Sequence, residues 1–139
     1  MSNGRRSNVG NRYRTGYLKS GVWFARRDRW FAEETTQRGQ VRCAITGQPG
    51  TKHTLQLHHL DYAGVRWNGA SWVAGESHDD LVAVRADVHE QLHRMLDTDQ
   101  VLRRNRRRRA ANLHAISRLR RRLHATVTDW TTTMTGSPA

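Results

Sequence analysis

Histidine is the residue type that points most directly to chemistry in this sequence. Six of the eight histidines lie between residues 53 and 93, and four of these form two pairs. His58 and His59 are adjacent, whereas His89 and His93 are four residues apart. Residues four apart share one face of a helix, and imidazole is a common ligand of zinc and other divalent cations. The second pair therefore predicts two metal ligands on a helix.

The adjacent pair predicts two separate roles. Residues 55–58 alternate apolar and polar side chains, which is typical of a strand, and neighbouring residues on a strand point to opposite sides. One of His58 and His59 can then bind a metal ion while the other faces a substrate. Asp79 and Asp80 come just before the next apolar run, where a carboxylate could orient a histidine ring. A metal ion, a general base and an orienting group are the components of metal-assisted hydrolysis.

Two other interpretations fit the same residues. A histidine pair at helical spacing is often a surface feature without a ligand. A structural zinc site also uses the same residue types as a catalytic one. The order strand, loop, strand, helix is the feature that favours a functional site.

Two strands and one helix are expected to position these histidines. The first strand ends at the adjacent pair, and residues 61–78 form a loop that contains a small hairpin. Asn68-Gly69, a common tight-turn dipeptide, lies between two tryptophans in that loop. Residues 81–84 are an apolar run of strand length, and residues 86–96 have apolar side chains at helical spacing.

Other elements flank this arrangement. Ser20 is expected to cap a helix that runs to about Glu34, with Gly39 as a stop signal, and residues 41–50 predict a short strand or knuckle. The apolar stripe of the first helix consists of Trp23, Trp30 and Phe31. A second stripe at spacings of three and four predicts one or two C-terminal helices. It consists of Leu113, Ile116, Leu119, Leu123, Val127 and Trp130.

Length and composition favour one domain of the α+β class. The chain has 139 residues, of which 36% are hydrophobic and 26% charged, enough for one modest core. We expect no membrane span, because no run of about 18 apolar residues occurs, and no secretory signal at the start. Cys43 is the only cysteine, which excludes a four-cysteine zinc site and an intramolecular disulfide. These features predict a cytoplasmic protein.

The net charge of +12 is unevenly distributed. Residues 1–30 hold eight basic side chains and one acid, and residues 98–139 hold ten and two, whereas residues 31–97 have a slight acidic excess. Basic ends of this kind favour a nucleic-acid partner, bound through phosphate contacts. A solvated or membrane-surface basic segment is the alternative. The residues expected to contact nucleic acid in these regions are Arg26, Arg27, Arg106, Arg107, Arg108 and Arg109.

The motifs together resemble those of the HNH endonuclease family. The resemblance rests on Leu55-Gln56-Leu57-His58-His59-Leu60-Asp61-Tyr62, on Asp80-Leu81-Val82-Ala83-Val84 and on His89-Glu90-Gln91-Leu92-His93. Residues 17–43 are also similar to the helix that leads into many bacterial and phage HNH domains. The resemblance covers residues 17 to about 96, and it implies a ββα-metal core of two short antiparallel strands and one helix.

This resemblance implies a role for each histidine of the two pairs. His58 and His89 would bind one divalent cation, Mg²⁺, Mn²⁺, Zn²⁺ or Ni²⁺, and His93 would add a ligand one turn later. His59 would be the general base that activates water for DNA hydrolysis. Asp80 occupies the position of the family's asparagine, nine residues before His89, and would orient the base. The expected products carry a 5′-phosphate and a 3′-hydroxyl.

The surroundings of the motif complete the prediction. Arg85 and Arg94 would bind flanking phosphates. Many relatives hold a structural zinc ion with four cysteines, of which only Cys43 is present here, so apolar contacts must replace that ion and Cys43 is expected to be a small buried residue.

Three regions are predicted: a basic arm over residues 1–16, a nuclease domain over 17–97 and a basic helical extension over 98–139. The extension could also bind a second copy of the chain or a phage or mobile-element protein. Two alternatives to a nuclease remain, namely a DNA-binding protein on a degenerate HNH scaffold and an accessory part of a larger machine.

Overall fold

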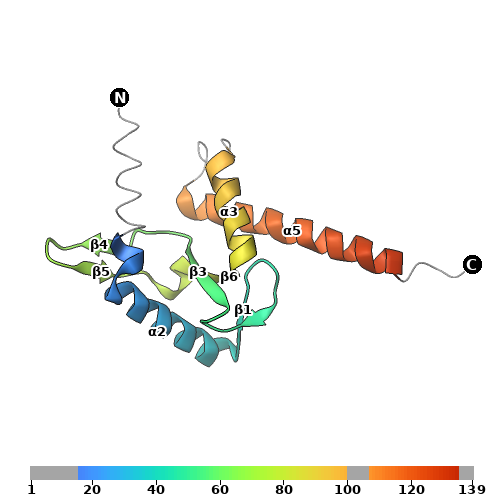
Figure 1. The fold of residues 1–139 in the computed structure, drawn as a ribbon. Coiled ribbons are helices and arrows are strands. Elements are labelled where there is room, and N and C mark those ends of the chain that lie inside the picture. The colour runs from blue at the N-terminus through green and yellow to red at the C-terminus, as the bar shows by residue number, and fades with distance from the viewer. Residues whose placement is uncertain (1–15, 100–106, 135–139) are drawn as a thin grey trace, which may run out of the picture. The chain divides into compact units, whose positions relative to one another are not determined.

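The structure, a computed structural model, describes residues 16–99 and 107–134, with side chains up to His124 in the second range. It has the predicted α+β class, with three α-helices and short strands paired in three two-stranded sheets within these ranges (Figure 1). Among the described residues, no helix has both the length and the apolar composition needed to cross a membrane. The predicted arm over residues 1–16 lies almost wholly outside the described ranges.

The chain folds into two compact units. The first comprises Met1–Val41 with Asp61–Leu81, and the second comprises Arg42–Leu60 with Val82–Ala139. The limits of the predicted nuclease domain stay a prediction, because compactness alone does not define a functional boundary.

Helix α2 (Gly21–Arg38) is the main element of the first unit and begins and ends at its predicted signals. The Ser20 side chain accepts a hydrogen bond from the backbone N–H of Trp23 at 3.2 Å, and Gly39 ends the helix with φ of 81°. The predicted apolar stripe is buried. The remaining buried residues of α2 are polar, Arg26 and Glu34, so the helix carries charge into the interior of this unit.

The predicted hairpin follows in the same unit. Strands β4 (Val65–Trp67) and β5 (Trp72–Ala74) pair antiparallel, with Trp67 opposite Trp72. The Asn68 side chain accepts hydrogen bonds from two backbone N–H groups of the turn, at 2.9 and 2.8 Å. At the base of the hairpin a Cβ on Gly64 would lie 2.2 Å from the carbonyl oxygen of Gly75, so only glycine allows the two backbones to approach this closely.

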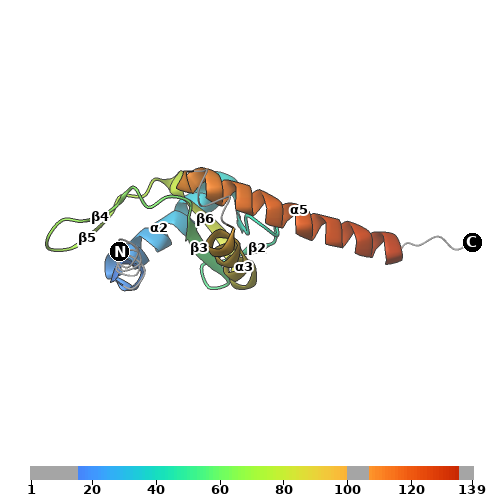
Figure 2. The ribbon, with the colours of Figure 1, turned by 90° about the horizontal axis from the view of Figure 1, so that it is seen from above.

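The second unit contains the elements that carry both histidine pairs. Strand β3 (Leu55–His59) pairs with β6 (Leu81–Arg85), and α3 (Ala86–Thr98) follows β6 directly. Two short strands, β1 (Val41–Arg42) and β2 (Pro49–Gly50), form the predicted knuckle. Figures 1 and 2 show α3 beside β3 and β6, and α5 (Arg108–Met134) also packs against α3.

The buried faces of α3 and α5 form the core of this unit. Val88 and Leu92 of α3 are buried, as the helical spacing predicted. On α5 the prediction was only partly right: Ile116 and Leu119 are buried, whereas Leu113 is 47% exposed. Among the side chains described for α5, the other buried residues are Ala111, Asn112 and Ala115, and Leu123 is half-buried. The buried face therefore includes positions 111, 112 and 115 in place of the predicted Leu113. Val127 and Trp130 lie beyond the described side chains.

Cys43 is buried at 1% exposure, as expected. Its sulfur accepts hydrogen bonds at 3.4 Å from the backbone N–H groups of Thr46 and Arg85. Burial by itself raises the pKa of the thiol, but a hydrogen bond from the Thr46 side chain, together with the backbone donors, outweighs burial and the net pKa is lowered. Hydrogen bonds to the sulfur therefore join the knuckle to the end of β6.

Candidate metal centre

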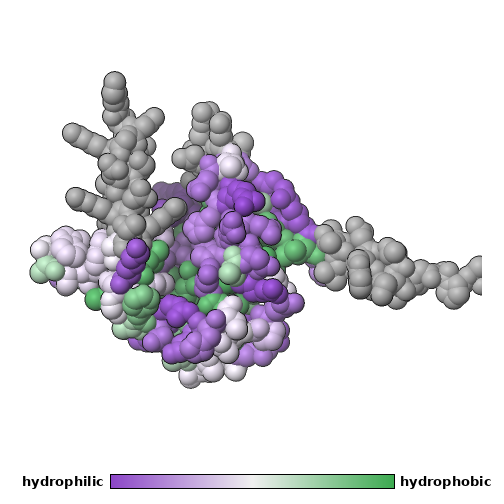
Figure 3. All heavy atoms as spheres, in the orientation of Figure 1, coloured by the Kyte–Doolittle hydropathy of each residue, from purple (hydrophilic) through white to green (hydrophobic). Residues whose placement is uncertain are grey.

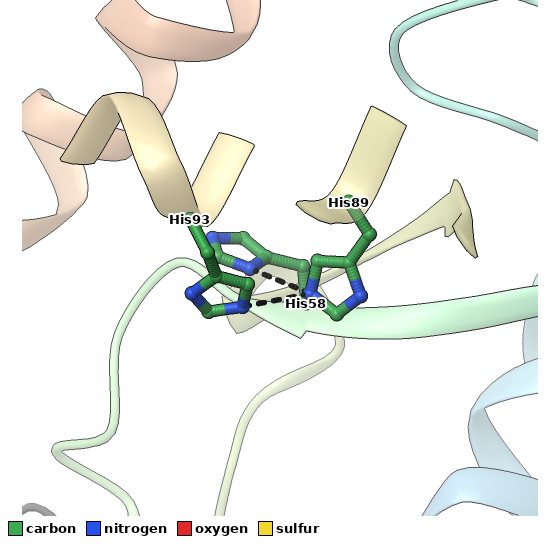
Figure 4. A group of neighbouring side chains, drawn as sticks. All are labelled: His58, His89 and His93. Carbon is green, nitrogen blue, oxygen red and sulfur yellow. Dashed lines mark hydrogen bonds between the residues drawn. The ribbon is translucent and has the colours of Figure 1, made fainter. Parts of the chain in front are cut away.

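Three histidine rings converge in the second unit. One ligand nitrogen from each of His58, His89 and His93 lies within 4.8 Å of the others, so the group could hold a metal ion. Nδ1 of His58 is 3.2 Å from Nε2 of His89, and Nε2 of His93 is 3.0 Å from that same His89 nitrogen. Figure 4 shows the His58 ring, from β3, facing the two rings that descend from α3. We call these residues the three-histidine centre.

Local structure explains why the rings meet. His89 and His93 are one turn apart on α3, which places their rings on one face with centroids 4.6 Å apart. His58 lies on β3, against which α3 packs, and its ring centroid is 5.2 Å from that of His89 and 5.0 Å from that of His93. The predicted strand and helix thus bring together the three predicted ligands.

Two amide side chains hold the outer edges of these rings. Nε2 of His58 lies 2.5 Å from Oδ1 of Asn112, and Nδ1 of His89 lies 2.7 Å from Oε1 of Gln56. An amide oxygen only accepts, so each of these ring nitrogens carries the proton and donates. In a neutral imidazole the other nitrogen then keeps its lone pair, and in both rings that nitrogen faces the middle of the centre.

Burial keeps the two rings neutral. It lowers the pKa of His58 to about 3; the hydrogen bond that His58 donates to Asn112 opposes this effect, and the nearby rings of His89, His93 and His59 add to it. Burial also lowers the pKa of His89 to about 4, with further lowering by His93 and His59. Two neutral rings therefore point lone pairs at each other across 3.2 Å. A cation would turn that repulsion into two bonds, so the donor set fits a divalent ion that accepts nitrogen ligands.

His59, the predicted general base, follows His58 on β3 and is 2% exposed. A positive charge on His59 would lower the pKa of both His58 and His89, so His59 lies close enough to influence the charge of the three-histidine centre. The prediction of a histidine that faces substrate did not anticipate this burial. A phosphodiester could reach the ring only if substrate binding opened a path to it.

Asp80, the predicted orienting group, belongs to a short 3₁₀ helix, η2 (His78–Asp80). One of its carboxylate oxygens accepts a hydrogen bond from the backbone N–H of Ser77 at 3.0 Å, which closes a capping box. The side chain therefore has a local structural role, and its action on His59 stays a prediction.

A second histidine cluster in the first unit was not predicted. Nδ1 of His78 lies 3.0 Å from a carboxylate oxygen of Glu33, and Nε2 lies 2.5 Å from one of Glu34. The ring stacks on Trp30 with centroids 5.0 Å apart and an interplanar angle of 10°. We call these four residues the His78 cluster. Neither ring nitrogen of His78 is directed at an open position.

The arginines that were predicted to contact nucleic acid differ in how exposed they are. Arg26 is 3% exposed, and its Nε donates to the backbone oxygen of Glu76 at 3.2 Å. This placement contradicts the predicted contact between Arg26 and nucleic acid. The reason is spacing: Arg26 lies three residues after Trp23 and four before Trp30, so it shares their buried face. Arg27 is half-buried, and its guanidinium lies 5.4 Å from the ring centroid of Phe31.

The other predicted arginines lie in the second unit. Arg85 is half-buried and donates to a glutamine side chain. Arg94 has 69% of its side chain exposed and pairs with a glutamate one turn before it, at 3.3 Å. In residues 107–109 the first two arginines are exposed and Arg109 is half-buried. Arg106 lies outside the described residues.

Comparison with models of known families, with curated proteins and with solved structures finds no match for this chain. Its site is therefore defined by its own geometry, that of a small α+β protein with a three-histidine centre.

The sequence analysis identified neither Gln56 nor Asn112 as part of this centre. Gln56 had left a signal, because it is two residues before His58 and so lies on the same side of β3. Asn112 left none, because it falls outside the apolar stripe predicted for this helix, and only the structure shows that it is buried with hydrogen-bond partners.

Proposed function

We propose that this protein is a metal-dependent endonuclease of the HNH type that hydrolyses phosphodiester bonds of DNA. The observation that supports it is the convergence of His58, His89 and His93 on one point, with His59 next to His58 on the same strand. Strand β3, its partner β6 and helix α3 would correspond to the ββα-metal core. The motif order in the sequence supports the same assignment.

The three-histidine centre would hold one divalent cation, Zn²⁺, Ni²⁺, Mn²⁺ or Mg²⁺. Imidazole ligands favour the first two, whereas phosphodiester chemistry in cells often uses the last two. When bound, the cation supplies a Lewis acid that stabilises negative charge on the phosphate and on the leaving 3′ oxygen.

His59 would supply the general base. Its ring would take a proton from water as the water oxygen forms a bond to phosphorus and the bond to the 3′ oxygen breaks. The leaving oxygen takes a proton from solvent water and ends as a 3′-hydroxyl, and the other end of the cut carries a 5′-phosphate. Asp80 would orient the base. The burial of His59 requires that DNA binding expose this ring.

DNA is the proposed partner because of charge and exposure. The net charge is +12, and Arg94, Arg107 and Arg108 present exposed side chains in the unit that holds the centre. Figure 3 shows a largely hydrophilic surface over α3, whose exposed charged residues are Asp87, Glu90, Arg94 and Asp97. Because three of these four are acids, the proposed phosphate contacts would fall mainly to Arg107 and Arg108.

Plasmid cleavage with a panel of divalent metals tests the proposal. We expect EDTA to abolish cleavage and His59→Ala to reduce its rate by about 100-fold or more while metal binding remains. His53→Ala, which changes an exposed histidine in a turn, is the matched control and should cleave like the parent. If His59→Ala cleaves at the parent's rate, the assigned base is wrong.

DNA binding without cleavage is the second candidate, and the 2% exposure of His59 is the observation that favours it. Fluorescence anisotropy with a labelled duplex separates the two. A binder without activity would retain affinity in every metal and show no nicking in any of them, whereas the nuclease proposal requires nicking in at least one.

A further inference from the structure

We propose that Asn112, on helix α5, is a positioning residue of the metal centre, which keeps the proton of His58 on Nε2 and thereby leaves Nδ1 as the metal ligand. This inference rests on the proposed metal binding but not on DNA cleavage. It adds to the centre a residue from the predicted basic extension, beyond the segment that carries the HNH motifs.

The orientation of the Asn112 amide is fixed by its own hydrogen bonds. Its Nδ2 donates to the backbone oxygen of Leu60 at 3.2 Å and to that of Arg108 at 2.9 Å. Both partners are carbonyls, which only accept, so the NH₂ group must face them. Oδ1 is then left to face His58, at 2.5 Å from Nε2.

A fixed acceptor determines the tautomer of His58. Nε2 must carry the ring proton to satisfy Oδ1, because the opposite tautomer would direct a lone pair at an oxygen lone pair. Both side chains are 3% exposed, so water cannot readily replace the lost partner. Nδ1, which faces His89 at 3.2 Å, is consequently free of a proton and able to ligate a cation. Outer partners of this kind usually fix the ring orientation of metal-bound histidines.

The position of Asn112 makes α5 part of the centre. The amide connects three segments of the second unit: the end of α5 that begins at Arg108, the backbone just after β3, and the ring of His58. Ala111 and Ala115, its buried neighbours on α5, have small side chains. They allow the helix to approach closely enough for a short asparagine to reach the ring.

Two variants separate positioning from mere packing. Asn112→Leu removes the acceptor as well as the amide donor, whereas Asn112→Asp replaces the donor with a second oxygen, which carries negative charge when ionised, and retains an oxygen for Nε2. Ser117→Ala, at an exposed position of the same helix, is the control. Co²⁺ affinity is measured by absorbance titration, and the His58 tautomer is measured by ¹⁵N NMR on the metal-free protein.

We expect Asn112→Leu to weaken Co²⁺ binding by about 10–100-fold, the usual range for loss of an outer partner. Asn112→Asp should stay within about threefold of the parent, because a carboxylate also accepts from Nε2. The NMR spectrum should show the proton on Nε2 in the parent and a changed tautomer in Asn112→Leu.

Three outcomes would overturn the proposal. The first is that Asn112→Leu binds Co²⁺ as tightly as the parent. The second is that both variants lose the same Co²⁺ affinity. The third is that the His58 ring of the parent carries its proton on Nδ1. A parent that binds no Co²⁺ would overturn the proposed metal centre as well. A parent that binds Co²⁺ but cuts no DNA would overturn only the nuclease.

Discussion

The three-histidine centre and the His78 cluster use the same residue type in opposite ways. In the first, three imidazoles face one another and the outer contacts of His58 and His89 are neutral amides. In the second, one imidazole lies between the carboxylates of Glu33 and Glu34. The first arrangement gathers lone pairs without compensating charge, whereas the second already pairs its ring with acids.

The two clusters differ in what their ring nitrogens contact: both nitrogens of His78 are bound by carboxylates, whereas one nitrogen of His58 is directed at the other two rings. His58 is more buried than His78, yet it is the ring that directs a nitrogen to an open position. Acids beside a histidine satisfy its ring nitrogens directly, so the His78 cluster is suited to hold α2 and η2 together.

The largest expected contrast is in metal affinity. His58→Ala removes a ligand and should weaken Zn²⁺ or Co²⁺ binding by more than the about 100-fold that loss of an outer partner can cost. His78→Ala should leave the affinity within about twofold, because its nitrogens are committed to Glu33 and Glu34. Isothermal titration of the two purified variants measures both values. Equal losses would mean that the two clusters are not functionally distinct.

The free energy of unfolding of the metal-free protein should depend on His78, which has little expected effect on metal affinity. His78→Ala leaves the carboxylate of Glu34, which is only 12% exposed, without its ring partner, so we expect the metal-free protein to lose about 1–3 kcal/mol of unfolding free energy. The parent should gain about 2.7 kcal/mol when Zn²⁺ is present at 100 times its dissociation constant. Urea unfolding with and without Zn²⁺ provides these values.

The stabilisation that Zn²⁺ gives each variant distinguishes the two clusters. His78→Ala should retain the Zn²⁺ increment, whereas His58→Ala should lose it. An increment that disappears in His78→Ala but persists in His58→Ala would reverse the assignment of the two clusters.

A separate effect is expected when the pH is lowered. The pKa of His58 and that of His89 are lowered to about 3 and about 4, against about 6.5 in an unfolded chain. The unfolded state therefore binds protons first as the pH falls. The stability that depends on neutral His58 and His89 is fully present above about pH 6.5 and is lost progressively down to about pH 3, the lower of the two folded-state pKa values. In His89→Gln, the free energy of unfolding should fall less steeply with decreasing pH than in the metal-free parent. Urea midpoints between pH 7 and 4.5 measure it, and parallel curves would show that His89 titrates normally.

Much of the arrangement could be predicted because it depends on local pattern. Ser20 and Gly39 bound α2 as their side-chain and backbone chemistry requires, and the alternation in β3 and the four-residue spacing in α3 bring the three ligands together. The predicted contact of Arg26 with nucleic acid followed its charge, although its spacing from Trp23 and Trp30 places it on the buried face of α2. Only packing reveals that it donates to Glu76.

By itself, the sequence determined which residues could be ligands, since spacing and residue type are local properties. The tertiary structure alone decided their surroundings: that acids flank His78 but not His58, that His59 is buried, and that Asn112 reaches His58 across 54 positions of the chain. The physical reason is that hydrogen bonding and desolvation act between groups close in space, and the contacts that join α5 to β3 have no periodic signature in the chain.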